Sequence, residues 1–248
     1  MAKTEFESDM ALVEKSIAKT KYMDSIRLLN QLLDKYKGKK EETADILSKM
    51  SQAYYGLEGV KTDNAIKYLI DSLNIRKELN QPDIISLEMM NLAYLQDEIG
   101  DPKVAITTLS DALEVSKILE DQNLILSIRC AMADMLSEVK SSILEAKRIY
   151  AEVMEESEKL NDWENYFEAC VSLIKIIRDQ GNLDEASSVA DHNIEKSERV
   201  ISGLKTKKEI EEFKEVVSYL YDVSIDLAME NQDMEKAMDL AKKLNSEK

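Results

Sequence analysis

The chain has 248 residues, and its 33 Lys and Arg against 49 Asp and Glu give a formal net charge of -16 at pH 7. Hydrophobic residues make up 44 %, enough for a sizeable core, which excludes a disordered acidic polymer. The 6 glycines and 2 prolines are too few for the many turns of an all-β or doubly wound fold. The 2 cysteines exclude a disulfide-rich secreted scaffold. We therefore expect a soluble protein built of helices.

Neither the N-terminus nor the charge suggests export, a membrane or a nucleic acid. Residues 1–10 lack the basic segment and following apolar segment of a signal peptide, and no apolar run is long enough to span a bilayer. The excess of acidic residues repels phosphate backbones. The sequence therefore predicts a cytoplasmic protein that binds neither membranes nor nucleic acids.

A repeat of about 40 residues organises the chain. Residues 50–66 and 90–106 align without a gap, with Met, Ala-Tyr, Glu and Ala-Ile at matching positions. A small residue recurs at intervals of 40, 40, 41, 40 and 51 residues, at Ser25, Ala65, Ala105, Ala146, Ala186 and Ala237. This spacing predicts six units, with an insertion of about eleven residues between the last two small positions.

Each unit is predicted to form two amphipathic helices. The pairs are expected at 4–20 and 23–36, 41–58 and 62–79, 83–99 and 102–119, 122–138 and 142–160, 162–180 and 183–202, and 206–230 and 233–246. Together they are predicted to form one domain over residues 1–248, with units near 4–36, 41–79, 83–119, 122–160, 162–202 and 206–246.

The third unit shows the punctuation of a helix pair most clearly. Pro82 stands where a helix tolerates proline in its first turn, and Gly100 marks the end of that helix. Asp101 is placed to cap the next helix, with Pro102 at its first position. The same region carries Ala93-Tyr94, Gly100-Asp101, Ala105, Leu109 and Ala112, a pattern that resembles the tetratricopeptide repeat.

The resemblance implies an all-α fold, an α-solenoid forming a right-handed superhelix of about six helix-turn-helix repeats. It also implies a non-enzymatic interaction module whose first helices line a concave groove that holds a peptide or helical segment of a partner protein. The units are longer than the usual repeat, as in the subfamily with longer helices, and the first unit lacks Gly-Asp.

Repeat phase predicts which residues of the first helices face this groove. Met and Tyr give an adaptable apolar surface, while the cationic residues would orient an acidic group of the ligand. The predicted groove residues are Met50, Tyr54, Met90, Tyr94, Arg129, Lys175 and Arg178. The alternatives are that Met and Tyr are packing residues and that Lys175 and Arg178 pair with Asp179 or Glu168 on their own helix.

The insertion in the last interval suggests a second class of function. It is expected to lengthen the helices on either side of Ser202-Gly203, and apolar residues near that turn could form a homodimer contact. These residues are Val200, Ile201, Leu204, Ile210 and Phe213. The chain would then be a self-associating structural scaffold. The competing interpretation is that the two long helices pack on each other. A peptide-responsive regulatory sensor is a third hypothesis.

Residues that carry catalysis or bind metals are not grouped in the sequence. The single histidine, His192, has no partner at metal-ligand or catalytic spacing, and we expect it at the surface. Cys130 and Cys170 lie one repeat apart and are expected to be buried thiols. The glycines form no phosphate-binding loop. The sequence predicts no enzyme activity, no cofactor and no metal.

Overall fold

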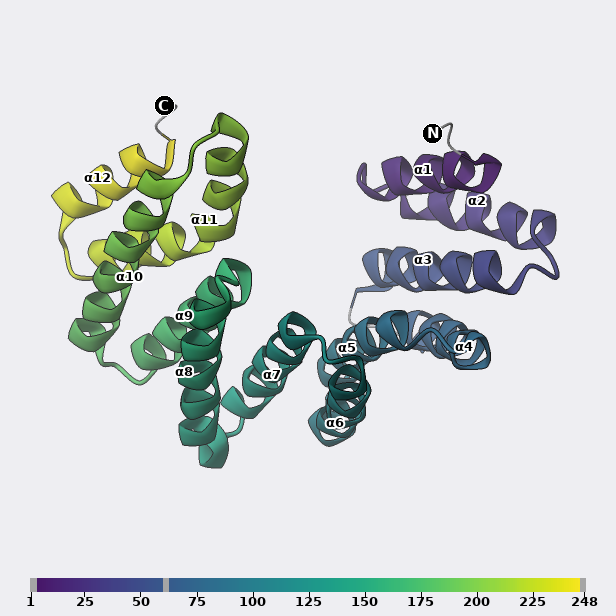
Figure 1. Cartoon of the computed structure of the whole chain (residues 1–248), viewed down its shortest axis with the longest axis horizontal. Helices are drawn as coiled ribbons and strands as arrows, with labels where there is room; N and C mark the ends of the chain where they lie inside the picture. Colours follow the sequence, from purple (N-terminus) through teal and green to yellow (C-terminus); the bar gives the residue numbers. More distant parts are fainter. Residues whose placement is uncertain (1–3, 60–62, 246–248) are drawn as a thin grey trace. The chain divides into compact units, whose positions relative to one another are not determined.

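The computed structural model describes residues 4–59 and 63–245, and these form twelve α-helices and one short 3-10 helix without any strand (Figure 1). The prediction of an all-α helical-repeat fold is confirmed. The chain divides into two compact units, Met1–Ala131 and Met132–Lys248, and the division falls within one helix, α7 (Gln122–Ser137). That residues 1–248 act as one domain stays a prediction.

The first unit holds six complete helices in three consecutive pairs. They are α1 (Glu5–Ile17), α2 (Tyr22–Lys35), α3 (Lys40–Glu58), α4 (Asp63–Leu79), α5 (Pro82–Glu98) and α6 (Pro102–Leu119). Each helix packs on the one that follows it up to α6, and α1 also contacts α3. The first helices α1 and α3 therefore lie next to each other, as a helical repeat requires.

The second unit continues the same pattern. After the 3-10 helix Lys140–Ser142 come α8 (Ile143–Leu160), α9 (Trp163–Asp179), α10 (Leu183–Gly203), α11 (Lys207–Glu230) and α12 (Met234–Asn245). Helix α9 packs on α8, α10 and α11, so the first helices α9 and α11 are in direct contact.

The predicted helix boundaries are confirmed to within three residues. The largest difference is the end of the first helix, predicted at residue 20 and found at Ile17, because Thr20 has a left-handed backbone with φ 55° that closes the turn into α2. The predicted boundaries at residues 62 and 246 lie outside the described residues. Pro82 and Pro102 open their helices, and the Asp101 side chain accepts a hydrogen bond from the Val104 backbone N–H, as predicted.

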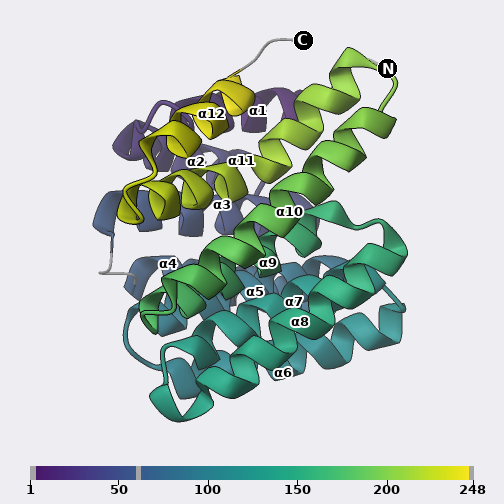
Figure 2. The same ribbon diagram turned by 90° about the vertical axis from the view of Figure 1, so that its left-hand side faces the viewer.

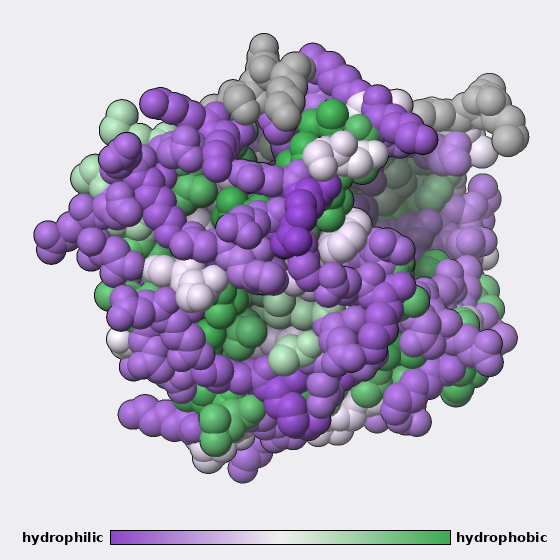
Figure 3. Space-filling view, turned by 60° about the vertical axis from the view of Figure 1, so that its left-hand side comes forward, coloured by the Kyte–Doolittle hydropathy of each residue, from purple (hydrophilic) through white to green (hydrophobic). Residues whose placement is uncertain are grey.

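The recurring small residues are buried at the contact between the paired helices. Ser25, Ala65, Ala105, Ala146 and Ala186 are fully buried, and Ala237 is nearly so. A longer side chain at these positions would hold the second helix of a pair away from its neighbours, which explains the period found in the sequence. The face shown in Figure 3 is mainly hydrophilic, with smaller hydrophobic areas among the hydrophilic side chains.

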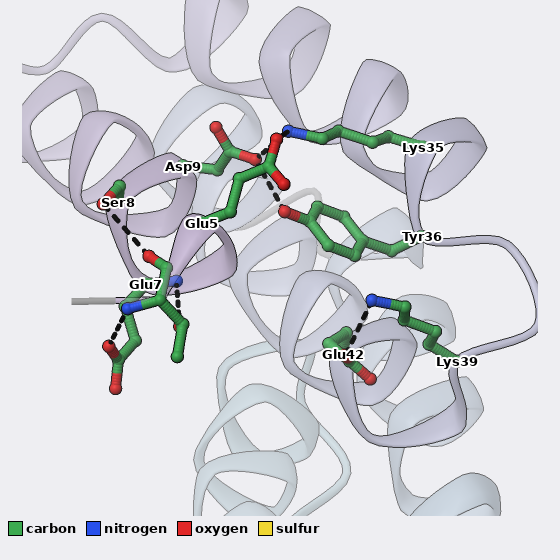
Figure 4. Close-up of polar contacts among 9 residues, drawn as sticks. Glu5, Glu7, Ser8, Asp9, Lys35, Tyr36, Lys39 and Glu42 are labelled. Atoms are coloured by element: carbon green, nitrogen blue, oxygen red, sulfur yellow. Dashed lines mark hydrogen bonds and ion pairs between the residues drawn. The ribbon is translucent and has the colours of Figure 1, made fainter. Parts of the chain in front are cut away.

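Polar contacts fix α1 to α2 at the start of the chain (Figure 4). Lys35 Nζ lies 2.6 Å from Asp9 Oδ2 and 2.8 Å from Glu5 Oε1, and the Tyr36 hydroxyl donates to Asp9 Oδ2 at 2.8 Å. The Lys35 ammonium, followed by the Tyr36 hydroxyl, holds the pKa of Asp9 below its usual range. These contacts set the position of a helix that forms one wall of the candidate site.

The insertion lengthens α10 and α11, as predicted, and Figure 2 shows these two helices running side by side. The turn between them ends at Thr206, whose side chain forms a capping box with Glu209. Phe213 is buried in the core of the second unit, and Val200, Ile201 and Leu204 pack against that core. The apolar residues of this hairpin therefore pack within the unit.

Candidate functional site

Two first helices of the first unit, α3 and α5, enclose a groove of about 580 Å³ that we call the tyrosine groove. Tyr55, 39 % exposed, and Tyr94, 38 % exposed, face it from the two helices. The Tyr55 hydroxyl donates to Glu98 Oε1 at 2.6 Å. The lining residues are Ser48, Lys49, Ser51, Gln52, Tyr55, Leu69, Asn91, Tyr94, Leu95 and Glu98.

A second groove, of about 910 Å³, lies among α1, α3 and α5, and we call it the Glu88 groove. Its walls are partly apolar, and its floor is polar. The lining residues are Thr4, Phe6, Glu7, Met10, Ala11, Glu14, Asp45, Ser48, Lys49, Arg76, Ile84, Leu87, Glu88 and Asn91. Ser48, Lys49 and Asn91 line both grooves, so the two grooves adjoin along the first helices of this unit, and we call them together the channel.

The floor of the Glu88 groove is a buried charged network. Arg76 is 2 % exposed and Glu88 4 % exposed. The Arg76 guanidinium pairs with Asp45 through Nη2 and donates from Nη1 to Gln81 Oε1 at 2.8 Å. Its Nε lies 3.7 Å from Glu88 Oε1, too far for a hydrogen bond, while Ser72 Oγ lies 2.9 Å from the same oxygen.

Burial raises the pKa of the Glu88 carboxyl, because water no longer solvates its charge. Ser72, Arg76 and Ser48 act in the opposite direction, and Asp45 adds a smaller upward contribution. Among the residues that the structure describes, Glu88 Oε2 and Arg76 Nε have no hydrogen-bond partner. A buried polar atom without a partner costs about 1–3 kcal/mol, so this floor is incomplete as it stands.

The second unit carries a separate groove of about 600 Å³ between α9 and α11, which we call the acidic groove. Its lining residues are Glu164, Phe167, Glu168, Val171, Ser172, Lys175, Glu212, Glu215, Val216 and Tyr219. Burial raises the pKa of Glu168, and the charges of Asp134, Glu164 and Asp162 raise it further. Four carboxylates against one lysine make this groove unsuited to an acidic ligand.

The structure places only part of the predicted groove residues in a groove. Tyr94 lines the tyrosine groove, and Lys175 lines the acidic groove. Met50 is fully buried in the core of the first unit, where no ligand can reach it. Tyr54 is half-buried and stacks on Tyr68, with ring centroids 5.2 Å apart. Met90 is half-buried and lines neither groove of the first unit.

The predicted cationic residues are not brought together. Arg129 lies half-buried on α7. Arg178 Nε lies 3.7 Å from Asp179 Oδ1, and its Nη1 lies 3.9 Å from Glu230 Oε1. The alternative that Arg178 pairs with Asp179 on its own helix is therefore what the structure shows. Among the residues predicted for self-association, Ile210 is half-buried and Phe213 is buried.

Sequence reasoning missed most of the residues that line the channel. A groove between two parallel first helices is lined by opposite flanks of those helices. It therefore takes Ser48, Gln52 and Tyr55 from α3 but Asn91 and Tyr94 from α5. The prediction of Tyr54 rests on repeat-equivalent positions lining the same surface, and in the structure Tyr55 lines the groove instead. The regular spacing of polar residues along α3 was the signal that could have located its exposed flank.

The single histidine and the two cysteines do not belong to a metal-binding cluster in the described part of the chain. His192 is exposed, and Cys130 and Cys170 are buried free thiols, as predicted. Burial raises the pKa of Cys170 to about 12, which keeps it protonated and unreactive. Within residues 4–59 and 63–245, no cluster of three or more His, Cys, Asp or Glu is placed to hold a metal ion. No helix in this part of the chain is both long and apolar enough to cross a membrane.

Comparison with known proteins rests on structure. No protein-family model and no curated protein sequence matches the chain. The kinesin light chain TPR-like repeats of Podospora anserina superpose with a TM-score of 0.60 at 14 % identity, covering 75 % of this chain and 91 % of that one. The chain has a tetratricopeptide-type repeat fold.

Two further structures share this tetratricopeptide-type fold. A Rap protein, solved in complex with competence and sporulation factor, matches with a TM-score of 0.63 at 16 % identity, covering 97 % of this chain and 74 % of that one. The apo form of RapI matches with a TM-score of 0.59 at 15 % identity, covering 98 % of this chain and 86 % of that one. The resemblance inferred from residues 93–112 is thus confirmed at the level of the fold.

Proposed function

We propose that the chain is a non-enzymatic protein-interaction module that binds a peptide or an extended segment of a partner protein in the channel of its first unit. The observation that carries this proposal is that the tyrosine groove and the Glu88 groove adjoin and share Ser48, Lys49 and Asn91. A ligand can follow such a channel past the exposed flanks of three consecutive first helices.

The channel offers suitable chemistry for a polypeptide. The side-chain amides of Gln52 and Asn91 both donate and accept hydrogen bonds, as a peptide backbone requires. Tyr55 and Tyr94 present rings with a polar end, and such residues supply much of the affinity at protein interfaces. Because the channel is built on packed helices, little conformational entropy is lost by the receptor when a ligand binds.

The comparison with the Rap protein supports the same proposal. That protein was solved with competence and sporulation factor bound, and it shares the fold over 97 % of this chain. The repeat fold is therefore compatible with a bound partner, although at 16 % identity the nature of the ligand does not carry over.

A selection of random peptides displayed on phage tests the proposal. The full chain is the bait, and enriched peptides are synthesised and titrated against it by fluorescence anisotropy. Replacing Asn91 and Tyr94 together by alanine should weaken binding by about 10-fold or more, because a tyrosine and a bidentate amide are removed from the channel. The variant should keep the helical circular dichroism of the wild type.

The matched control replaces Asn74 and Ile118, both exposed on α4 and α6 and outside the channel, by alanine. It should bind the same peptides with unchanged affinity. Peptides that bind both variants as tightly as the wild type, or a selection that enriches none, would show that this channel does not bind polypeptide segments.

A further inference from the structure

The Glu88 groove combines an apolar wall with an unpaired buried carboxylate oxygen. Phe6 and Ile84 are half-buried beside it, and Leu87 is 47 % exposed at its edge. Below them, Glu88 is 4 % exposed, and its Oε2 has no hydrogen-bond partner in the described part of the chain. A site of this form recognises a ligand that brings both an apolar group and a hydrogen-bond donor.

The contacts of Arg76 explain why the protein does not satisfy this oxygen itself. Its two terminal nitrogens are held by Asp45 and Gln81, which leaves Nε 3.7 Å from Glu88 Oε1. The Ser72 hydroxyl lies 2.9 Å from that same Oε1 and 3.0 Å from the Ala44 carbonyl oxygen, and its single proton can serve only one of them. Arg76 and Ser72 thus face Oε1, the Ser48 hydroxyl makes only a weaker contact with the carboxyl, and Oε2 has no hydrogen bond of normal length among the described residues.

The charges around the groove favour a cation. Its carboxylates are Glu7, Glu14, Asp45 and Glu88, against Lys49 and Arg76. Asp45 is paired with Arg76, Glu14 lies 3.6 Å from Lys49, and Glu7 caps α1 by accepting from the Thr4 backbone N–H at 2.7 Å. Glu88 has only the longer contact with Arg76, at 3.7 Å from Nε to Oε1, so its charge is compensated less than that of Asp45.

We infer that the groove binds its partner through a Lys or Arg side chain that donates a hydrogen bond to Glu88 Oε2, with a neighbouring apolar side chain of the ligand against Phe6 and Leu87. This inference rests on the proposed function and specifies its ligand. Glu88 lines this groove, so a ligand that occupies it lies against the Glu88 side chain. A second copy of this chain is disfavoured as the ligand, because two bodies of net charge -16 repel each other.

The test is a double-mutant cycle between the protein and an enriched peptide. Peptides selected on the wild-type chain should contain Lys or Arg next to an apolar residue. Changing that basic residue to Gln in the synthetic peptide should weaken binding to the wild type by about 10- to 100-fold, the range for a hydrogen bond to a charged group. The Glu88→Gln variant replaces the acceptor by an amide of the same shape, and it should bind both peptides with the same weak affinity.

Glu114→Gln is the matched control, because Glu114 is exposed on α6 and outside the channel. It should bind both peptides as the wild type does. A basic residue that contributes equally to binding by the wild type and by Glu88→Gln would overturn the inference. So would enriched peptides that carry no basic residue.

Failure of the inference and failure of the proposed function give different results. Peptides that require Asn91 and Tyr94 but are insensitive to Glu88 contradict the inference alone. If no peptide requires Asn91 and Tyr94, the proposed function fails, and the inference fails with it. If Glu88→Gln loses its helical circular dichroism, the peptide variants still test the inference on the wild-type protein. A peptide in which Gln or Glu replaces the basic residue, and which binds the wild type with unchanged affinity, contradicts the inference.

Discussion

Glu88 is an acid whose pKa in the folded state is raised above its ordinary value of 4.5, chiefly by burial. Below that ordinary value the group is protonated in both the folded and the unfolded chain, and it imposes no electrostatic penalty on folding. Between the ordinary pKa and the raised folded pKa the unfolded chain has released this proton while the folded chain still binds it, so the free energy of unfolding falls as the pH rises through this range. Glu88 therefore favours folding more in acid than at neutral pH.

Glu88→Gln should remove this dependence. The free energy of unfolding of the variant relative to the wild type is expected to increase between about pH 4 and about pH 7. Urea denaturation of both proteins at the two pH values measures the change. If the free energy of unfolding of Glu88→Gln relative to the wild type stays constant or decreases as the pH rises, burial does not destabilise the charged form of the Glu88 carboxyl.

Gly56 lies within α3 where the ring of Tyr22 on α2 approaches the backbone, and a Cβ at this position would overlap that ring. In a helix interior alanine is more favourable than glycine by about 1 kcal/mol, but overpacking costs about 1–3 kcal/mol. Gly56→Ala alone should therefore be neutral or destabilising. In a Tyr22→Ala background, where the ring is gone, the same change should stabilise the protein by about 1 kcal/mol.

Urea denaturation of the four proteins in this cycle gives the coupling between the two positions. Equal effects of Gly56→Ala in both backgrounds would show that Tyr22 does not restrict this position. The approach of α2 to α3 matters for the channel, because it helps to hold the helix that presents Gln52 and Tyr55.

At the scale of the element, the helices of this chain follow from local signals that a single sequence contains. The buried small residues, the proline at the start of α5 and the Asp101 cap all act within a few residues of the chain. The groove depends instead on which flanks of α3 and α5 face each other, and this is set by the angle between the helices. That angle leaves no period in the sequence, which is why repeat phase predicts Tyr54 as the equivalent of Tyr94, although Tyr55 lines the tyrosine groove beside Tyr94.

The α10–α11 hairpin is a second element whose role depends on tertiary packing. Phe213 of α11 is 7 % exposed, and its ring meets that of Phe167 on α9 edge to face, with centroids 5.9 Å apart. Phe213→Ala should lower the free energy of unfolding of the second unit by about 3–5 kcal/mol, the range for truncating a buried phenylalanine. Circular dichroism during urea denaturation measures the loss.

Lys208→Ala, at an exposed position of the same helix, is the control and should change stability by less than about 0.5 kcal/mol. A wild-type denaturation curve for Phe213→Ala would mean that this ring does not contribute to the core. The burial of Phe213 also affects how self-association can be tested. A polar residue at position 213 would damage the fold itself. A dimer is therefore better tested by sedimentation of the unmodified chain over a range of concentrations.

For the whole molecule, the net charge of -16 acts against stability. Like charges on a compact chain repel one another, whereas the unfolded chain separates them. The exposed ion pairs along single helices, such as Lys159 with Glu155 and Lys208 with Glu212, oppose this effect only weakly, because exposed pairs contribute about 0–1 kcal/mol each. Added salt should therefore weaken the repulsion between like charges by more than it weakens the attraction within the exposed ion pairs, and the folded state should become more stable.

Raising the NaCl concentration from about 0.01 M to about 0.1 M at neutral pH shortens the screening length from about 30 Å to about 10 Å. The Tm should rise, by about 2–4 °C for each kcal/mol of repulsion removed from a chain of this size.

Near the pI of about 4.7 the net charge vanishes, and the same addition of salt should then have little effect. Differential scanning calorimetry at both pH values makes the comparison. A Tm that falls with salt at neutral pH would mean that ion pairs, not net repulsion, dominate the electrostatics of folding, and the weight assigned to the surface charge would have to be reversed.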